Sequence, residues 1–119
     1  MKPAKQDLEI YQGSTFVKSF QWKTGVRKTP VDITGFSIRM QIRKSLTDTA
    51  VEANLTTENG GIVITDSPNG KFEIRITSSV TDTFTWTKGV YDLEMIYPEG
   101  EPVIRLIEGN VVNKLSVTR

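Results

Sequence analysis

Apolar and polar residues alternate with a period of two along much of this chain, which is typical of β-strands with one buried face. The clearest segment, residues 36–43, places four apolar side chains on one face and four polar side chains on the other: Phe36, Ile38, Met40 and Ile42 against Ser37, Arg39, Gln41 and Arg43. Residues 71–76 and 91–97 repeat the pattern. Three such strands predict a sheet with one face in a core and the other in solvent.

Weaker alternating patterns predict further strands. Sequences typical of turns separate these strands from one another. These strands are expected at residues 7–11, 15–22, 51–55, 61–65, 103–108 and 111–117. Turns containing glycine are expected at residues 59–61, 68–70 and 98–100, where a positive φ is needed. Because such short turns join antiparallel neighbours, we expect the chain from Gly61 onward to come close to a meander.

Residues 78–84 interrupt this pattern. Serine and threonine residues surround Val80 and Phe84, which are four positions apart. This spacing predicts one helical turn that closes an end of the fold with those two side chains.

The pattern as a whole predicts an all-β fold: an antiparallel β-sandwich of about eight strands, immunoglobulin-like, with one short helical turn near residues 78–84. The segment Gly89-Val90-Tyr91 resembles a tyrosine corner, in which the tyrosine hydroxyl bonds back to the preceding corner. At 119 residues the chain has the size of one domain. We expect residues 1–119 to form a single sandwich domain, with residues 1–11 as an N-terminal arm or edge strand.

The composition of the chain excludes several kinds of catalytic site, metal site and binding partner. The chain contains no cysteine and no histidine, which excludes thiolate nucleophiles, histidine-dependent triads and the usual zinc ligands. Its formal net charge of +1 provides no general attraction for nucleic acid or an anionic membrane. No run of 18 apolar residues and no apolar signal segment is present. We therefore expect no enzymatic activity, no cofactor or metal, and neither nucleic acid nor membrane as partner.

Two groups of acidic residues are candidate sites. Asp92 and Glu94 lie two positions apart on an outer strand face, where an acid/base pair is conceivable, but alternation and basic neighbours such as Arg75 or Arg105 account for them. Residues 66–70 offer oxygen atoms beside a glycine but lack the ligand spacing of a calcium loop. We interpret that segment as a turn.

Basic and aromatic residues supply the candidate interface. The densest basic group consists of Arg27, Lys28, Arg39, Arg43 and Lys44. Without aromatic residues between them, these cations suit solvent or the rim of an acidic protein partner better than single-stranded nucleic acid. Trp22 continues an even spacing from Phe16 and Phe20 and is expected in the core, whereas Trp86 is a candidate for sugar or subunit contact. The candidate interface residues are Arg39, Arg43, Arg105 and Trp86.

Four stretches of the sequence, taken in order, resemble a known group of proteins. They are DLEIYQGSTFVKSFQW, TPVDITGFSIRMQIR, GGIVITDSPNGKFEIRITSSVTDTF and GVYDLEMIYPEGEPVIRLIEGNVVNKLSVTR. They are similar to small tailed-bacteriophage virion proteins and to the N-terminal domain of phage baseplate upper proteins. The resemblance covers nearly the whole chain, and its most specific pieces are PVDITG before a strand and YDLE before a hairpin and a closing VTR.

This resemblance implies a virion structural protein of the tail, baseplate or fibre-attachment region, made in the bacterial host cytoplasm. It implies an assembly or adaptor module, present as a homo-oligomer or in several copies, that binds other phage virion proteins. On this hypothesis we expect the N-terminal arm to pair with a neighbouring subunit or to lie over its surface. The absence of a long fibrous extension argues against the receptor-binding fibre itself. Two alternatives remain open: a carbohydrate-binding β-sandwich module, with glycan as the less favoured partner, and a capsid decoration protein.

Overall fold

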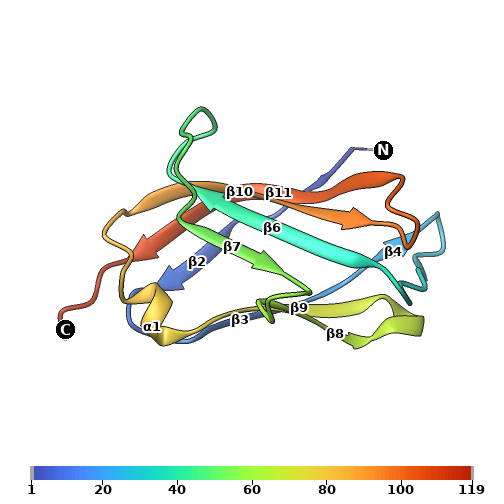
Figure 1. Ribbon diagram of the computed structural model, residues 1–119, viewed down its shortest axis with the longest axis horizontal. Helices are drawn as coiled ribbons and strands as arrows, with labels where there is room; N and C mark the ends of the chain where they lie inside the picture. The colour runs from blue at the N-terminus through green and yellow to red at the C-terminus, as the bar shows by residue number, and fades with distance from the viewer. Residues whose placement is uncertain (1, 119) are drawn as a thin grey trace.

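The computed structural model describes residues 2–118, which form two packed β-sheets (Figure 1). The elements in chain order are β1 (Ala4–Lys5), β2 (Leu8–Tyr11), β3 (Phe16–Gln21), β4 (Lys23–Thr24), β5 (Thr29–Pro30), β6 (Ser37–Arg43), β7 (Ala53–Thr56), β8 (Ile62–Asp66), the 3-10 turn η1 (Ser67–Asn69), β9 (Lys71–Ile76), α1 (Ser78–Thr81), β10 (Lys88–Ile96) and β11 (Val103–Lys114). The predicted immunoglobulin-like β-sandwich with one short helix is confirmed.

The two sheets divide the strands unequally. The large sheet has the order β1-β11-β10-β6-β7, with β2 also paired to β11, and the small sheet has the order β3-β9-β8. Strands β4 and β5 form a separate hairpin. Neighbouring strands are antiparallel except that β1 and β2 both run parallel to β11. The N-terminal segment is therefore an edge of this chain's own large sheet.

The core lies between the sheets and follows from the period-two pattern. On β6 and β10 the alternate apolar side chains point inward and are at most 4% exposed: Ile38, Met40, Ile42, Tyr91, Leu93 and Met95. They face Phe72, Ile74 and Ile76 of β9, which are also buried. Full burial of each such aliphatic or aromatic side chain contributes about 1.5–3 kcal/mol, so these strands dominate the stability of the fold.

The expected meander after Gly61 is confirmed within the hairpins β8–β9 and β10–β11 but is wrong between them. Strands β9 and β10 belong to opposite sheets, and the turn after β7 likewise connects the large sheet to the small one. A short turn can cross the end of a sandwich as well as close a hairpin, so turn length alone did not fix the neighbours. The glycines expected to need a positive φ do have one, at Gly60, Gly70 and Gly100.

The two strands expected at residues 103–108 and 111–117 form one strand, β11, which ends at Lys114. A register shift in its pairing with β10 leaves Leu106 without a directly opposite residue. This β-bulge turns both Leu106 and Ile107 toward the interior, where both are buried. The bulge breaks the period-two pattern, which is why the sequence reads as two strands.

Helix α1 lies where the sequence predicts it, but a different side chain closes the fold. Val80 is 40% exposed, whereas Thr81 and Phe84 are buried. The Thr81 hydroxyl donates to the Ser14 carbonyl at 2.8 Å and accepts from the Gly13 amide at 3.1 Å. A buried threonine thus joins α1 to the turn between β2 and β3, and the predicted inward role of Val80 is wrong.

Candidate interaction face

The outer surface of the large sheet carries a regular grid of polar side chains, which we call the outer face. Strand register places Glu108, Asp92, Gln41 and Asn54 in one row across β11, β10, β6 and β7. The next row consists of Arg105, Glu94, Arg39 and Thr56. Because neighbouring side chains in a row lie close enough to interact, the register decides which charges meet.

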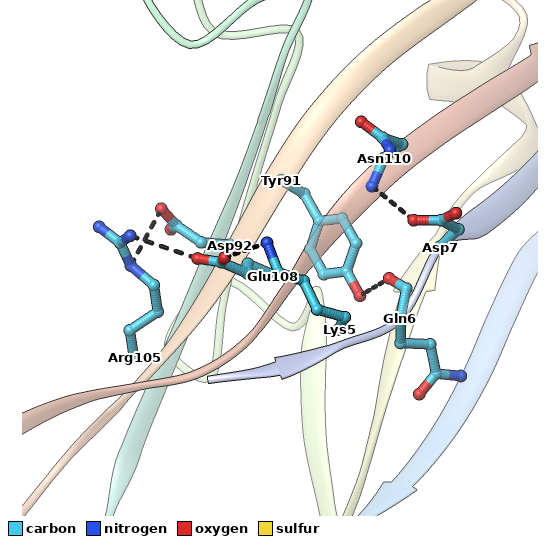
Figure 2. A network of polar contacts seen from close by, with 8 residues as sticks. All are labelled: Lys5, Gln6, Asp7, Tyr91, Asp92, Arg105, Glu108 and Asn110. Carbon is cyan, nitrogen blue, oxygen red and sulfur yellow. Dashed lines mark hydrogen bonds and ion pairs between the residues drawn. The ribbon is translucent and has the colours of Figure 1, made fainter. Parts of the chain in front are cut away.

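Ion pairs link most of the charges on this face. Arg39 Nε lies 2.7 Å from Glu94 Oε1. Arg105 bridges two acids, with its Nε 3.6 Å from Asp92 and its Nη1 3.4 Å from Glu108, and Lys5 Nζ lies 2.7 Å from Glu108 (Figure 2). Exposed pairs of this kind contribute about 0–1 kcal/mol each. They order the side chains of the face more than they stabilise the fold.

Arg43 differs from the other two arginines. Its Nη1 donates to the Asp48 carbonyl at 2.8 Å and its Nη2 donates to Gln41 Oε1 at 3.0 Å. Among residues 2–118, no carboxylate forms an ion pair with it. Its side chain is held by hydrogen bonds to neutral groups, and its charge acts on Asp92 without a direct ion pair, because it opposes the rise that burial causes in the pKa of that carboxyl group.

The charged grid borders a shallow groove of about 730 Å³. Asp92 lies in it beside Arg105, and Leu46, 84% exposed, lies on its rim. Partial burial raises the pKa of Asp92; Arg105 opposes this rise, and the charges of Glu94 and Glu108 add to it. The hydrogen bond from Lys5 is the main cause that lowers the pKa of Glu108.

The interpretation of Asp92 and Glu94 as outer-face acids with basic neighbours is confirmed, with one change of partner. Arg105 is one of those neighbours, but Arg75 lies on the small sheet and pairs with Glu73 at 2.6 Å. Among the residues described, no group of three or more acidic side chains is placed to hold a metal ion. In the same part of the chain, no helix is long and apolar enough to cross a membrane.

The N-terminal arm closes one side of the outer face (Figure 2). The Tyr91 hydroxyl donates to the Gln6 carbonyl at 2.5 Å, the Gln6 amide donates to the Glu108 carbonyl at 3.0 Å, and Asp7 Oδ1 accepts from the Asn110 amide at 2.9 Å. Burial, followed by the charge of Asp7, raises the pKa of Tyr91 to about 12. The expected tyrosine corner is wrong, because this hydroxyl bonds to the arm and not to the preceding corner.

Gly109 permits this docking and was missed as a functional position. A Cβ atom on Gly109 would lie 2.1 Å from the Gln6 carbonyl oxygen and 2.7 Å from its carbon. Only a residue without a side chain allows the arm to run so close along β11 at this position. A glycine inside a strand often marks such an approach of another backbone, so the sequence did contain a signal for this contact.

The structure brings together three of the four candidate interface residues. Arg39, Arg43 and Arg105 all project from the outer face, whereas Trp86 is only 8% exposed. The Trp86 ring packs on Phe84 with centroids 4.9 Å apart. Trp86 is therefore a core residue and offers no open ring surface for a sugar or a subunit. Trp22 is buried as expected.

Residues 2–114 match the family described as LtfC-like, beta-sandwich domain. This chain belongs to that family. No curated protein matches the chain.

Solved structures show the fold of this LtfC-like domain in other proteins. The N-terminal domain of phage TP901-1 ORF48 matches with a TM-score of 0.55 and 10% identity, covering 95% of this chain and 90% of that one. The NK cell receptor NKp44, described as a triggering partner in natural cytotoxicity, matches with a TM-score of 0.51 and 15% identity, covering 96% of this chain and all of that one. The family match and the phage domain confirm the resemblance at the level of the fold: this chain is a β-sandwich domain similar to the N-terminal domain of phage TP901-1 ORF48.

Proposed function

We propose that this LtfC-like domain is a non-enzymatic structural module of a phage tail. In this proposal it acts as an assembly or adaptor module that binds neighbouring virion subunits through the outer face. The observation that carries the proposal is the uncovered grid of ordered charges on β11, β10 and β6. The family and the phage domain of the same fold support a tail-associated role.

The outer face has the properties of a selective contact surface. Its ion pairs hold Arg39 and Arg105 in fixed positions before any partner arrives, which lowers the entropy cost of binding. Among residues 2–118, Arg43 provides a cation that forms no ion pair with a carboxylate, and the exposed side chain of Leu46 lies on the same groove. Such charge patterns give specificity and correct register more than raw affinity. We expect the partner surface to present a carboxylate opposite Arg43.

A carbohydrate-binding role loses its basis in this geometry. That alternative depended on an exposed tryptophan ring, and both Trp22 and Trp86 are buried. The outer face presents no aromatic platform among its row residues. Contact with protein subunits is therefore the proposal that we retain.

A complementation experiment in a phage that lacks this chain tests the proposal. The wild-type chain, Arg43→Glu and Arg27→Glu are supplied in turn, and their amounts in purified particles are measured by quantitative mass spectrometry. Arg27 lies in the exposed β4–β5 connection, away from the outer face, and serves as the matched control. Urea unfolding of each purified variant first verifies that it folds.

We expect Arg43→Glu to lower incorporation about tenfold, the effect of losing about 1.4 kcal/mol of contact energy, and Arg27→Glu to leave it unchanged. Tails counted by electron microscopy should decrease in parallel with incorporation. The proposal would be overturned if Arg43→Glu were incorporated at the same level as the wild-type chain. It would also be overturned if the wild-type chain were absent from purified particles.

A further inference from the structure

A second surface, distinct from the outer face, lies along the free edge of β3. Within residues 2–118, β3 pairs with β9 and with no other strand. The N-terminal strands β1 and β2 pair with β11 in the other sheet, so they do not cover β3. The sandwich is thus open between β1 and β3, and Figure 1 shows the two strands in different layers.

The backbone of this edge is ready to pair. Trp22 donates its amide to the Gly70 carbonyl at 2.9 Å, and in this register Phe20 and Lys18 lie opposite Phe72 and Ile74. Antiparallel strands alternate between residues that bond the neighbour and residues that face away. The amide and carbonyl groups of Val17, Ser19 and Gln21 therefore face the open edge.

A groove of about 440 Å³ runs beside this edge, between β3 and the pair β1 and β11. Its apolar lining comes from both sheets: Phe20, Trp22, Phe72, Leu106 and Ile107. The indole nitrogen of Trp22 is buried without a hydrogen-bond partner among the residues described. An extended segment paired to β3 would place every second side chain against this lining.

The charges around the groove are all positive. Lys2 and Lys23 line it, and no acidic residue among those described does. Lys18 stands on the core-facing side of β3, between the half-buried Phe16 and Phe20, and forms no ion pair with any described residue. A lysine pointing inward on an edge strand disfavours pairing with a second copy of the same edge. The edge is suited to a strand of opposite charge.

We propose that β3 and its groove accept an extended strand with alternating apolar side chains and acidic flanks, donated by another virion protein. The strand would pair with the outward backbone groups of Val17, Ser19 and Gln21, and its acidic flanks would meet Lys18 and Lys23. This inference rests on the proposed function only in naming a virion protein as the donor. It uses a different surface, so the two proposals can fail separately.

The test uses a fluorescein-labelled peptide of seven residues, in which valine and isoleucine alternate with threonine and glutamate closes each end. Binding to the full chain is followed by fluorescence anisotropy. Ser19→Pro removes one outward amide, a change that free strand edges tolerate, and Ser19→Ala keeps that amide as the matched control. We expect Ser19→Pro to weaken binding about tenfold and Ser19→Ala to leave it unchanged.

A second pair of variants keeps the test decisive if Ser19→Pro proves unstable in urea unfolding. Lys18→Glu should weaken binding of the glutamate-ended peptide and strengthen binding of a lysine-ended peptide with the same core. Lys18→Met should weaken binding of the glutamate-ended peptide without strengthening binding of the lysine-ended one. Arg43→Glu on the outer face should leave peptide binding unchanged. No binding of the glutamate-ended peptide, or equal binding by Ser19→Pro, Lys18→Glu and the wild type, would overturn this inference. Either result would leave the outer-face proposal to its own test.

Discussion

Replacing Gly109 by alanine should release the N-terminal arm from β11. The added Cβ would lie 2.1 Å from the Gln6 carbonyl oxygen and 3.1 Å from Asp7 Oδ1, and contacts below 3.0 Å are essentially never seen. The atom that obstructs the Cβ is backbone and not the flexible end of a side chain. Gly109 does not have a positive φ, so the alanine itself meets no backbone strain. The arm must therefore withdraw by about 1 Å or detach.

The cost follows from the contacts that hold the arm in place. Withdrawal breaks the bond from the Tyr91 hydroxyl to Gln6 and the bond from the Gln6 amide to Glu108, each worth about 0.5–1.5 kcal/mol net. The exposed pair of Lys5 with Glu108 adds less than about 1 kcal/mol. We expect Gly109→Ala to lower the free energy of unfolding by about 1–4 kcal/mol.

Urea unfolding followed by circular dichroism measures this cost, and limited trypsin digestion after Lys5 reports release of the arm. The control is the same substitution in a chain that begins at Leu8, where Gln6 and Asp7 are missing. In that background Gly109→Ala should cost almost nothing, because the obstructing atoms are absent. An equal cost in both backgrounds would refute the reasoning.

Four further outcomes are expected. Tyr91→Phe leaves the Gln6 carbonyl without its donor and should lower the free energy of unfolding in urea by about 1–3 kcal/mol; wild-type stability would contradict this. Because the Tyr91 pKa is about 12 when folded and 10.0 ordinarily, its stabilising contribution is complete below pH 10 and declines as the pH rises toward 12, a slope that should be smaller in Tyr91→Phe. Asp92→Asn should raise the urea midpoint at neutral pH, since burial and the charges of Glu94 and Glu108 disfavour the Asp92 carboxylate; a lower midpoint would show that its contact with Arg105 dominates. Arg39→Ala breaks one exposed ion pair and should cost less than about 1 kcal/mol, and a cost above about 2 kcal/mol would show that the outer face is part of the stabilising structure.

The amino-acid sequence determined the strands and their faces wherever the pattern is local. The alternation in residues 36–43 and 91–97 correctly predicts the buried faces of β6 and β10, because successive side chains of a strand point to opposite faces. The turn glycines and helix α1 were likewise predicted from neighbouring residues. For the same reason Arg39, Arg43 and Arg105 could be assigned to an exposed face before their neighbours were known.

Only the tertiary structure decided which strands are neighbours. The charge pairs of the outer face depend on the register of β6, β10 and β11, and the bulge at Leu106 shifts that register. The burial of Trp86 was likewise decided by the tertiary structure, since it depends on Phe84 and the elements around it. A period of two identifies the face of a residue but carries no information about the residue opposite, because backbone hydrogen bonds between strands are the same for nearly every side chain.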